Sequence, residues 1–130
     1  MENKYMKTII STDKAPAAIG PYSQGISSDT ITITSGQLPI DPATEKFPDG
    51  GISEQARQAL KNVQAVLAGA GLSLDNVIKT TVFLKDMNDF AAMNEVYATF
   101  FSNNPPARSA VEVARLPKDA LVEIEAIATR

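Results

Sequence analysis

The sequence predicts an α+β domain with the element order βββαβαββ, in which a mixed sheet carries both helices on one face. Alternating β-branched runs indicate the strands, and two longer stretches with apolar residues at the i, i+3, i+4, i+7 spacing indicate the helices. Segments rich in Pro and Gly separate these elements. The chain of 130 residues suits one hydrophobic core, so we expect a single domain over residues 1–130.

The N-terminal half begins with strands and ends in a long loop. Residues 8–11 are a short apolar segment, and residues 13–25 ("DKAPAAIGPYSQG") have the Pro and Gly content of a loop that runs into a strand. The β-branched alternation of residues 30–37 ("TITITSGQ") predicts a strand ending at Gly36. Three prolines in residues 38–51 predict a loop.

A first helix is predicted from Ser53, which is a suitable N-cap, to the stop signal at Gly71. Glu54 suits the first turn because it favours the positive end of the helix dipole. The apolar stripe of this helix comprises Ala56, Ala59, Leu60, Val63, Leu67 and Ala70.

A strand over residues 76–86 and a second helix starting near Asn88 follow. One face of the second helix carries aromatic and apolar side chains, namely Phe90, Met93, Tyr97 and Phe100. Asn94 interrupts this stripe, either as a tolerated boundary residue or as a residue that lines a site.

Two last strands, over residues 107–114 and 120–128, are joined by a short turn, which predicts an antiparallel hairpin. Pairing Arg115 with Ala120 would place Glu112 opposite Glu123 and Arg108 opposite Ile127. Arg108 and Glu123 would then lie about 13 Å apart at ~3.3 Å per residue. A small ligand could touch both only with another subunit, a bulge or a different register, and the opposed glutamates count against this register.

Alternation assigns the faces of these two strands. One set of alternate residues is expected to face the helices and comprises Val111, Val113, Val122, Ile124 and Ala126. The other set mixes charged, small and apolar residues and fits either solvent or a polar subunit interface. It comprises Arg108, Ala110, Glu112, Ala114, Glu123, Glu125 and Ile127.

Composition excludes several function classes. A formal charge of −3 and a pI near 4.9 make nucleic acid a disfavoured partner. The N-terminal ten residues lack an apolar signal core, and no segment approaches the ~20 apolar residues of a membrane span, so we expect a cytoplasmic protein. The chain contains no Cys and no His, which excludes disulfides, thiol nucleophiles, Cys/His zinc sites and Ser-His-Asp triads. Catalysis would have to use carboxylates, Arg, Lys, hydroxyls, backbone groups and water.

Arg108 is either a surface arginine or an anion clamp, since a guanidinium can grip a carboxylate through two parallel hydrogen bonds. Glu112, Glu123 and Glu125 are either solvated or acid/base groups. The segments "GPYSQG" (20–25) and "TSGQ" (34–37) place hydroxyls beside glycines, where the backbone can approach a ligand. Neither segment matches a phosphate-binding fingerprint.

Taken together, these residues resemble the Rid family of reactive intermediate deaminases, formerly called YjgF, and most closely its RidA branch. The resemblance covers essentially the full chain and follows the family order and spacing. It rests on the segments "APAAIGPYSQG", "ITSGQLP", "QARQALKNVQAVLAGAGL", "VIKTTVFLKDMNDFAAMNEVYATFF" and "PARSAVEVARLPKDALVEIEAIA".

The resemblance implies a chorismate-mutase-like fold that assembles as a homotrimer, with a central barrel of sheets, helices outside and pockets between subunits. It implies hydrolysis of enamines and imines, such as 2-aminoacrylate, 2-iminopropanoate and 2-iminobutanoate, to 2-oxo acids and ammonia without a cofactor or metal. It also implies a role in removing reactive intermediates. A small-carboxylate-binding regulatory protein and an endoribonuclease or translation inhibitor stay open as alternatives.

By position, the resemblance assigns Arg108 to the substrate carboxylate and Glu123 to the hydrolytic water. It places Tyr22, Ser35, Gly36 and Asn94 in the pocket lining. Ala110 stands where the branch commonly has Cys, so its backbone N–H is retained while a thiol is lost.

Overall fold

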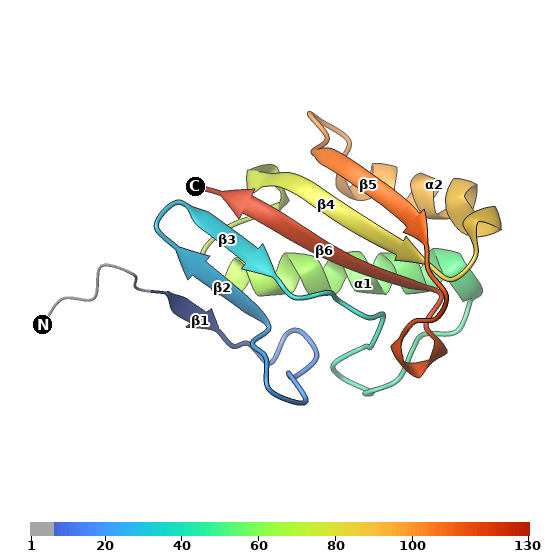
Figure 1. The fold of residues 1–130 in the computed structure, drawn as a ribbon, viewed down its shortest axis with the longest axis horizontal. Coiled ribbons are helices and arrows are strands. Elements are labelled where there is room, and N and C mark those ends of the chain that lie inside the picture. The colour runs from blue at the N-terminus through green and yellow to red at the C-terminus, as the bar shows by residue number, and fades with distance from the viewer. Residues whose placement is uncertain (1–6) are drawn as a thin grey trace, which may run out of the picture.

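The computed structural model describes residues 7–130. The order of its strands and α-helices is βββαβαββ, as predicted. The elements are β1 (Thr8–Ile10), β2 (Gly25–Ser28), β3 (Ile31–Thr34), α1 (Gly51–Gly69), β4 (Val77–Leu84), α2 (Phe90–Phe100), β5 (Ala107–Glu112) and β6 (Val122–Thr129). Figure 1 shows both helices behind the same face of the sheet, which confirms the α+β architecture.

The strands form one mixed sheet in the order β1-β2-β3-β6-β4-β5. Only the β4–β5 pair is parallel, and α2 forms the crossover between these two strands. The predicted β5–β6 hairpin is therefore wrong, because β4 lies between them and pairs with both. A helical crossover brings β5 to the sheet edge, and the segment 113–121 then crosses the end of β4 to reach β6.

The faces of β5 are also opposite to the prediction. Thr80 of β4, which is fully buried beneath α2, pairs directly with Arg108, so Arg108 faces the helices. Val111 faces the other way and is 43% exposed. Because β5 is an edge strand with few large side chains, pairing with β4 and not hydrophobic alternation decides its face.

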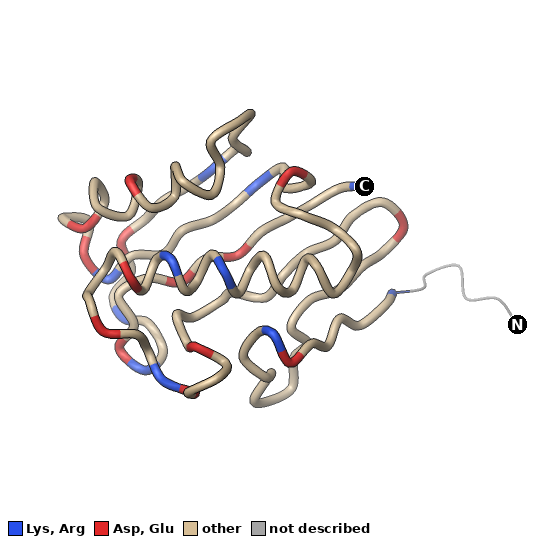
Figure 2. The backbone as a smooth tube through the Cα atoms, turned by 180° about the vertical axis from the view of Figure 1, so that it is seen from behind, with Lys and Arg blue, Asp and Glu red and all other residues tan. Residues whose placement is uncertain are grey.

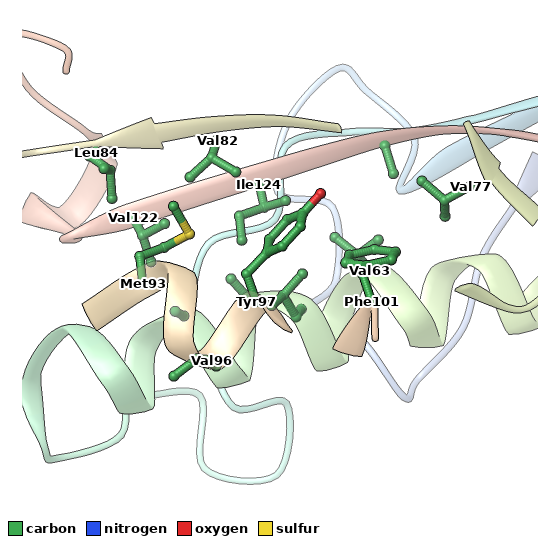
Figure 3. Packing of buried hydrophobic residues seen from close by; sticks show 14 of the residues in the cluster. Val63, Val77, Val82, Leu84, Met93, Val96, Tyr97, Phe101, Val122 and Ile124 are labelled. Carbon is green, nitrogen blue, oxygen red and sulfur yellow. The ribbon is translucent and has the colours of Figure 1, made fainter. Parts of the chain in front are cut away.

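In β6 the predicted alternation is confirmed. Val122, Ile124 and Ala126 are buried beneath the helices, while Glu123 and Glu125 face the opposite side of the sheet. Figure 3 shows Met93 and Tyr97 of α2 pointing from the helix layer into this core. The Tyr97 hydroxyl hydrogen-bonds the Thr80 hydroxyl at 2.7 Å, which satisfies two polar groups inside the core.

Helix α1 begins two residues before the predicted N-cap. Gly50, with a φ of 113°, precedes its first residue, so Ser53 lies inside the first turn. The left-handed backbone conformation of Gly50 brings the chain out of the preceding loop, and the helix therefore begins earlier than the predicted N-cap Ser53 indicates.

The face of the sheet that carries no helices is more apolar than the sequences of the last two strands, β5 and β6, predicted. Isoleucines from the N-terminal strands face the same open side of the sheet as Glu123 and Glu125. Five branched residues there are between 37% and 61% exposed: Ile9, Ile31, Ile33, Val111 and Ile127. Within residues 7–130, neither helix has the length and apolar character needed to cross a membrane.

A buried amide on α1 fastens the long loop that precedes the helix. Asn62, only 1% exposed, donates hydrogen bonds to the carbonyls of Leu38 and Ile40 at 2.9 and 2.8 Å. Its carbonyl oxygen accepts a hydrogen bond from Gln58 at 2.9 Å. The position of the loop therefore depends on one side chain of the helix.

Replacing Asn62 with Ala should lower the free energy of unfolding by roughly 2 to 4 kcal/mol, because two loop carbonyls lose their donor. Urea denaturation at matched protein concentration measures this loss. The exposed Gln64, two residues along the same helix, supplies the control. A Gln64→Ala variant should stay within about 0.5 kcal/mol of the parent, and equal effects of the two substitutions would contradict the fastening role.

Candidate active site

The candidate site begins where the chain leaves β3. The β3–β6 ladder ends at the Ile33–Ile127 pair. Beyond it, the backbone N–H of Gln37 donates to the Ile124 carbonyl at 2.7 Å, and the Ile124 N–H donates to the Gln37 carbonyl at 3.1 Å. Between these two connections, Ser35 and Gly36 bow away from β6. This bow places Gly36 directly against Glu123.

The contact between Gly36 and Glu123 requires glycine. A Cβ atom at position 36 would lie 2.6 Å from the Oε2 atom of Glu123, which is closer than real Cβ contacts. Gly36 therefore lets the carboxyl group rest against the backbone. Burial raises the pKa of Glu123, and repulsion from Glu125 raises it further. A half-buried carboxyl with a raised pKa has the properties of a group that accepts and returns protons.

Glu123 lies in a cleft of about 540 Å³ that also contains three other residues expected in the site, Tyr22, Ser35 and Gly36. Tyr22 is 53% exposed. The Ser35 hydroxyl donates its proton to the Ser23 carbonyl at 2.5 Å. Toward a ligand, Ser35 can therefore only accept a hydrogen bond.

Buried amides hold two walls of the cleft. The Gln24 side chain accepts a hydrogen bond from the Thr12 N–H at 2.7 Å and donates to the carbonyls of Thr12 and Pro16 at 2.9 and 2.8 Å. Asn62 holds the wall that contains Leu38 and Ile40. The walls are thus fixed before any ligand binds.

Three polar residues of this cleft were not among the predicted site residues, namely Gln24, Gln37 and Lys118. Gln24 and Gln37 lie in the two glycine-containing segments 20–25 and 34–37, which were the available signal, whereas a lysine in a turn is a typical surface residue. Their position in the cleft depends on contacts between segments far apart in the chain.

Arg108 occupies a second candidate region, on the helix-covered side of β5. Its Nη1 atom donates to the Asn94 side-chain oxygen at 2.7 Å. The guanidinium carbon lies 4.7 Å from the centre of the Tyr97 ring and 5.4 Å from that of Phe90. The amide and the rings orient the guanidinium, while its other N–H groups stay available for an anion.

The neighbours of Arg108 complete this region. Burial raises the pKa of Tyr97, although the Thr80 hydrogen bond and the charge of Arg108 act in the opposite direction. Tyr97 is therefore a neutral ring at working pH. Ala110 lies two residues beyond Arg108 on the same face of β5 and packs against the core.

One chain does not join the two regions. Arg108, Asn94 and Ala110 lie on the helix-covered side of the sheet, whereas Glu123 points to the opposite side. The predicted separation of about 13 Å was wrong, because it assumed that β5 and β6 pair in a hairpin. The sheet itself separates the two charges, since they lie on its opposite faces. Glu112 has a structural contact, because its Oε1 accepts the Met87 N–H at 2.8 Å.

Acidic side chains in the described part of the chain do not gather into a metal-binding group of three. The chemistry that these regions can support is anion binding at Arg108 and proton transfer at Glu123.

Three known relatives have similar sequences, and the solved structures of two of them have similar folds. The 2-iminobutanoate/2-iminopropanoate deaminase of Salmonella typhimurium is 54% identical over 96% of this chain and 99% of its own. The crystal structure of the YjgF gene product from Escherichia coli has a TM-score of 0.92 and 53% identity, covering 95% of this chain and 98% of that one. Escherichia coli TdcF with bound serine has a TM-score of 0.91 and 52% identity, with the same coverage.

The family model described as Endoribonuclease L-PSP matches residues 12–130. This match contains every residue of both candidate regions. Together with the relatives above, it shows that the chain belongs to the Endoribonuclease L-PSP family and confirms its resemblance to the Rid family, formerly called YjgF.

Proposed function

We propose that the protein is a cofactor-independent deaminase that hydrolyses small 2-imino acids and their enamine tautomers to 2-oxo acids and ammonia. The Salmonella relative carries the name of this activity, and the TdcF relative holds serine, a small amino acid. The observation that carries the proposal is the pair of complementary groups, an oriented guanidinium at Arg108 and a half-buried carboxyl at Glu123.

The proposed enzyme is a homotrimer whose sheets form a central barrel. The exposed isoleucines of the open face support this assembly, because a second copy would remove them from water. The edge strand β5 brings Arg108 to the border of the chain, where it can reach the Glu123 cleft of a neighbouring copy. Each active site is then shared between two subunits.

In the proposed reaction, Arg108 binds the substrate carboxylate and places C2 beside Glu123. The ionised Glu123 takes a proton from water as the oxygen attacks C2 and the C=N electrons pass to nitrogen. Glu123 returns this proton to the nitrogen, which gives a carbinolamine. The proton of the new C2 hydroxyl then passes by way of Glu123 to the nitrogen as the C–N bond breaks, which releases ammonia and leaves a C2 carbonyl. Ser35 accepts a hydrogen bond from the nitrogen. Tyr22 and Gly36 line the pocket, and Asn94 and Ala110 support the arginine side.

The distribution of charged residues does not support the ribonuclease activity that the family description names. Figure 2 shows Lys and Arg interspersed with Asp and Glu along residues 7–130, without the continuous basic path that binds a phosphate backbone. A small-carboxylate sensor would share the Arg108 contact but would not need a proton-accepting group at Glu123.

Replacing Arg108 with Ala should lower kcat/KM for 2-iminobutanoate at least about a hundredfold, because the carboxylate loses its charged partner. Ammonia release measures this effect. Arg108→Lys should recover little, since one ammonium cannot reproduce the planar fork. Near-parental turnover by Arg108→Ala would overturn the proposed role.

The same variant tests whether the sites are shared. Co-refolding equal amounts of Arg108→Ala and Glu123→Gln chains should restore about one quarter of the sites, because three quarters of random trimers are mixed and each has one intact site of three. The unmixed variants are the controls. A mixture no more active than its components would contradict shared sites while leaving the single-variant results intact.

Replacing Glu123 with Gln should reduce kcat/KM about 10²- to 10⁴-fold, because the amide cannot accept a proton. In the parent, the ionised form is the active one, so activity should fall as the pH drops through the raised pKa, above the ordinary value of 4.5. Glu125→Gln is the matched control. This variant should keep the turnover of the parent. Because it removes the repulsion between Glu125 and Glu123, it should move the acid limb of the pH profile to lower pH. An unmoved limb would show that another group controls the profile.

Replacing Gly36 with Ala should lower kcat about tenfold to a hundredfold, because the new methyl group displaces the Glu123 carboxyl. The free energy of unfolding should change by less than about 1 kcal/mol, since the end of a glutamate side chain can move. Paired kinetic and thermal measurements separate the two effects. Equal losses of stability and activity would indicate general damage instead.

A further inference from the structure

The cleft extends beyond the region that a small imino acid needs. A neighbouring hollow of about 390 Å³ shares five of its lining residues with the cleft: Pro16, Ala17, Ile19, Ile40 and Lys118. The cleft itself, at about 540 Å³, lies within the range of pockets that hold drug-sized ligands, roughly 300–1,000 Å³. A four-carbon acid occupies only part of this volume, which in the proposed trimer it shares with the Arg108 side chain of a neighbouring copy.

Lys118 is the only basic residue among those that line the cleft, and Glu123 is the only acidic one. Lys118 lines both the cleft and the hollow, and the hollow adds two acidic residues, Asp13 and Glu45, that do not line the cleft. Most of the lining that the cleft and the hollow share is apolar, including Ile19 and Ile40.

The backbone holds Lys118 in an unfavourable conformation at this position. Lys118 and Asp119 have φ values of 57° and 56°, in the left-handed region that disfavours side chains. The turn is closed by the Ala120 N–H donating to the Pro117 carbonyl at 3.2 Å and by the Arg115–Asp119 ion pair at 2.9 Å. A strained residue held by its surroundings is typical of a functional position.

We propose that Lys118 binds a second carboxylate, at the far end of the substrate side chain, so that the cleft accepts dicarboxylic 2-imino acids such as 2-iminoglutarate. This inference rests on the proposed function and extends its substrate class. The apolar walls would contact the methylene groups, and the two charges of the substrate would meet Arg108 of a neighbouring copy and Lys118. The chemistry at C2, addition of water and loss of ammonia, is unchanged.

The test compares two imines in the parent and in Lys118→Met, which keeps the length of the side chain but removes its charge. An amino-acid oxidase forms 2-iminobutanoate from 2-aminobutanoate, and a glutamate oxidase forms 2-iminoglutarate from glutamate. The ratio of kcat/KM for 2-iminoglutarate to that for 2-iminobutanoate should fall about fivefold in Lys118→Met, as expected for one exposed ion pair. Lys118→Arg should keep the ratio.

The matched control is Lys61→Met, which removes an equal charge from an exposed lysine of α1 that lines neither the cleft nor the hollow. It should leave the ratio unchanged. An unchanged ratio in Lys118→Met, an equal fall in Lys61→Met, or a parent that hydrolyses 2-iminobutanoate but not 2-iminoglutarate would each overturn the inference.

Binding of the 2-oxo acid products separates this inference from the proposed function. Calorimetry measures the affinities for 2-oxoglutarate and 2-oxobutanoate. The ratio of the first affinity to the second should also fall about fivefold in Lys118→Met, which is about what one exposed ion pair contributes. If neither imine is hydrolysed, the proposed activity fails, and the binding ratio alone decides the role of Lys118. Equal loss of affinity for both acids in Lys118→Met would overturn it.

Discussion

The pairing of β6 with both β3 and β4 is the constraint on which the rest of the molecule depends. Alternation along this central strand turns its valine, isoleucine and alanine side chains toward the helices and its glutamates toward the open face. The bridge between Gln37 and Ile124 returns the outgoing chain to the strand and leaves the bow at Gly36. The cleft, its carboxyl group and the core are therefore consequences of one strand pairing.

The sheet also keeps the two charged groups of the site apart. If Arg108 and Glu123 shared a face in one chain, they could form an ion pair that would occupy the guanidinium and lower the pKa of the carboxyl. On opposite faces, Arg108 contacts a neutral amide and two rings, and Glu123 rests against a glycine. Both groups stay available to a ligand, and in the proposed trimer the assembly of copies would complete a site.

Buried amides give the cleft its rigidity. Gln24, Asn62 and Gln55 each bond the backbone of a distant segment, and Gln55 accepts the N–H of Leu121 just before β6. Every buried side-chain nitrogen or oxygen in residues 7–130 has a partner. Because a half-satisfied buried amide would be costly, these networks favour a single arrangement of the walls. A preformed cleft suits a reaction that depends on positioning more than on a strong nucleophile.

Periodicity and composition were enough to predict the order of the elements, the buried face of α1 and β6, and the chemistry excluded by the lack of Cys and His. Periodicity is a local property of the chain, and composition is a global one. Three other features depend on how the chain folds: β4 separates β5 from β6, Arg108 faces the helices, and Lys118 lies in the cleft. Strand partners and loop positions depend on contacts between distant segments, and a short edge strand or a turn lysine carries no local pattern that specifies them.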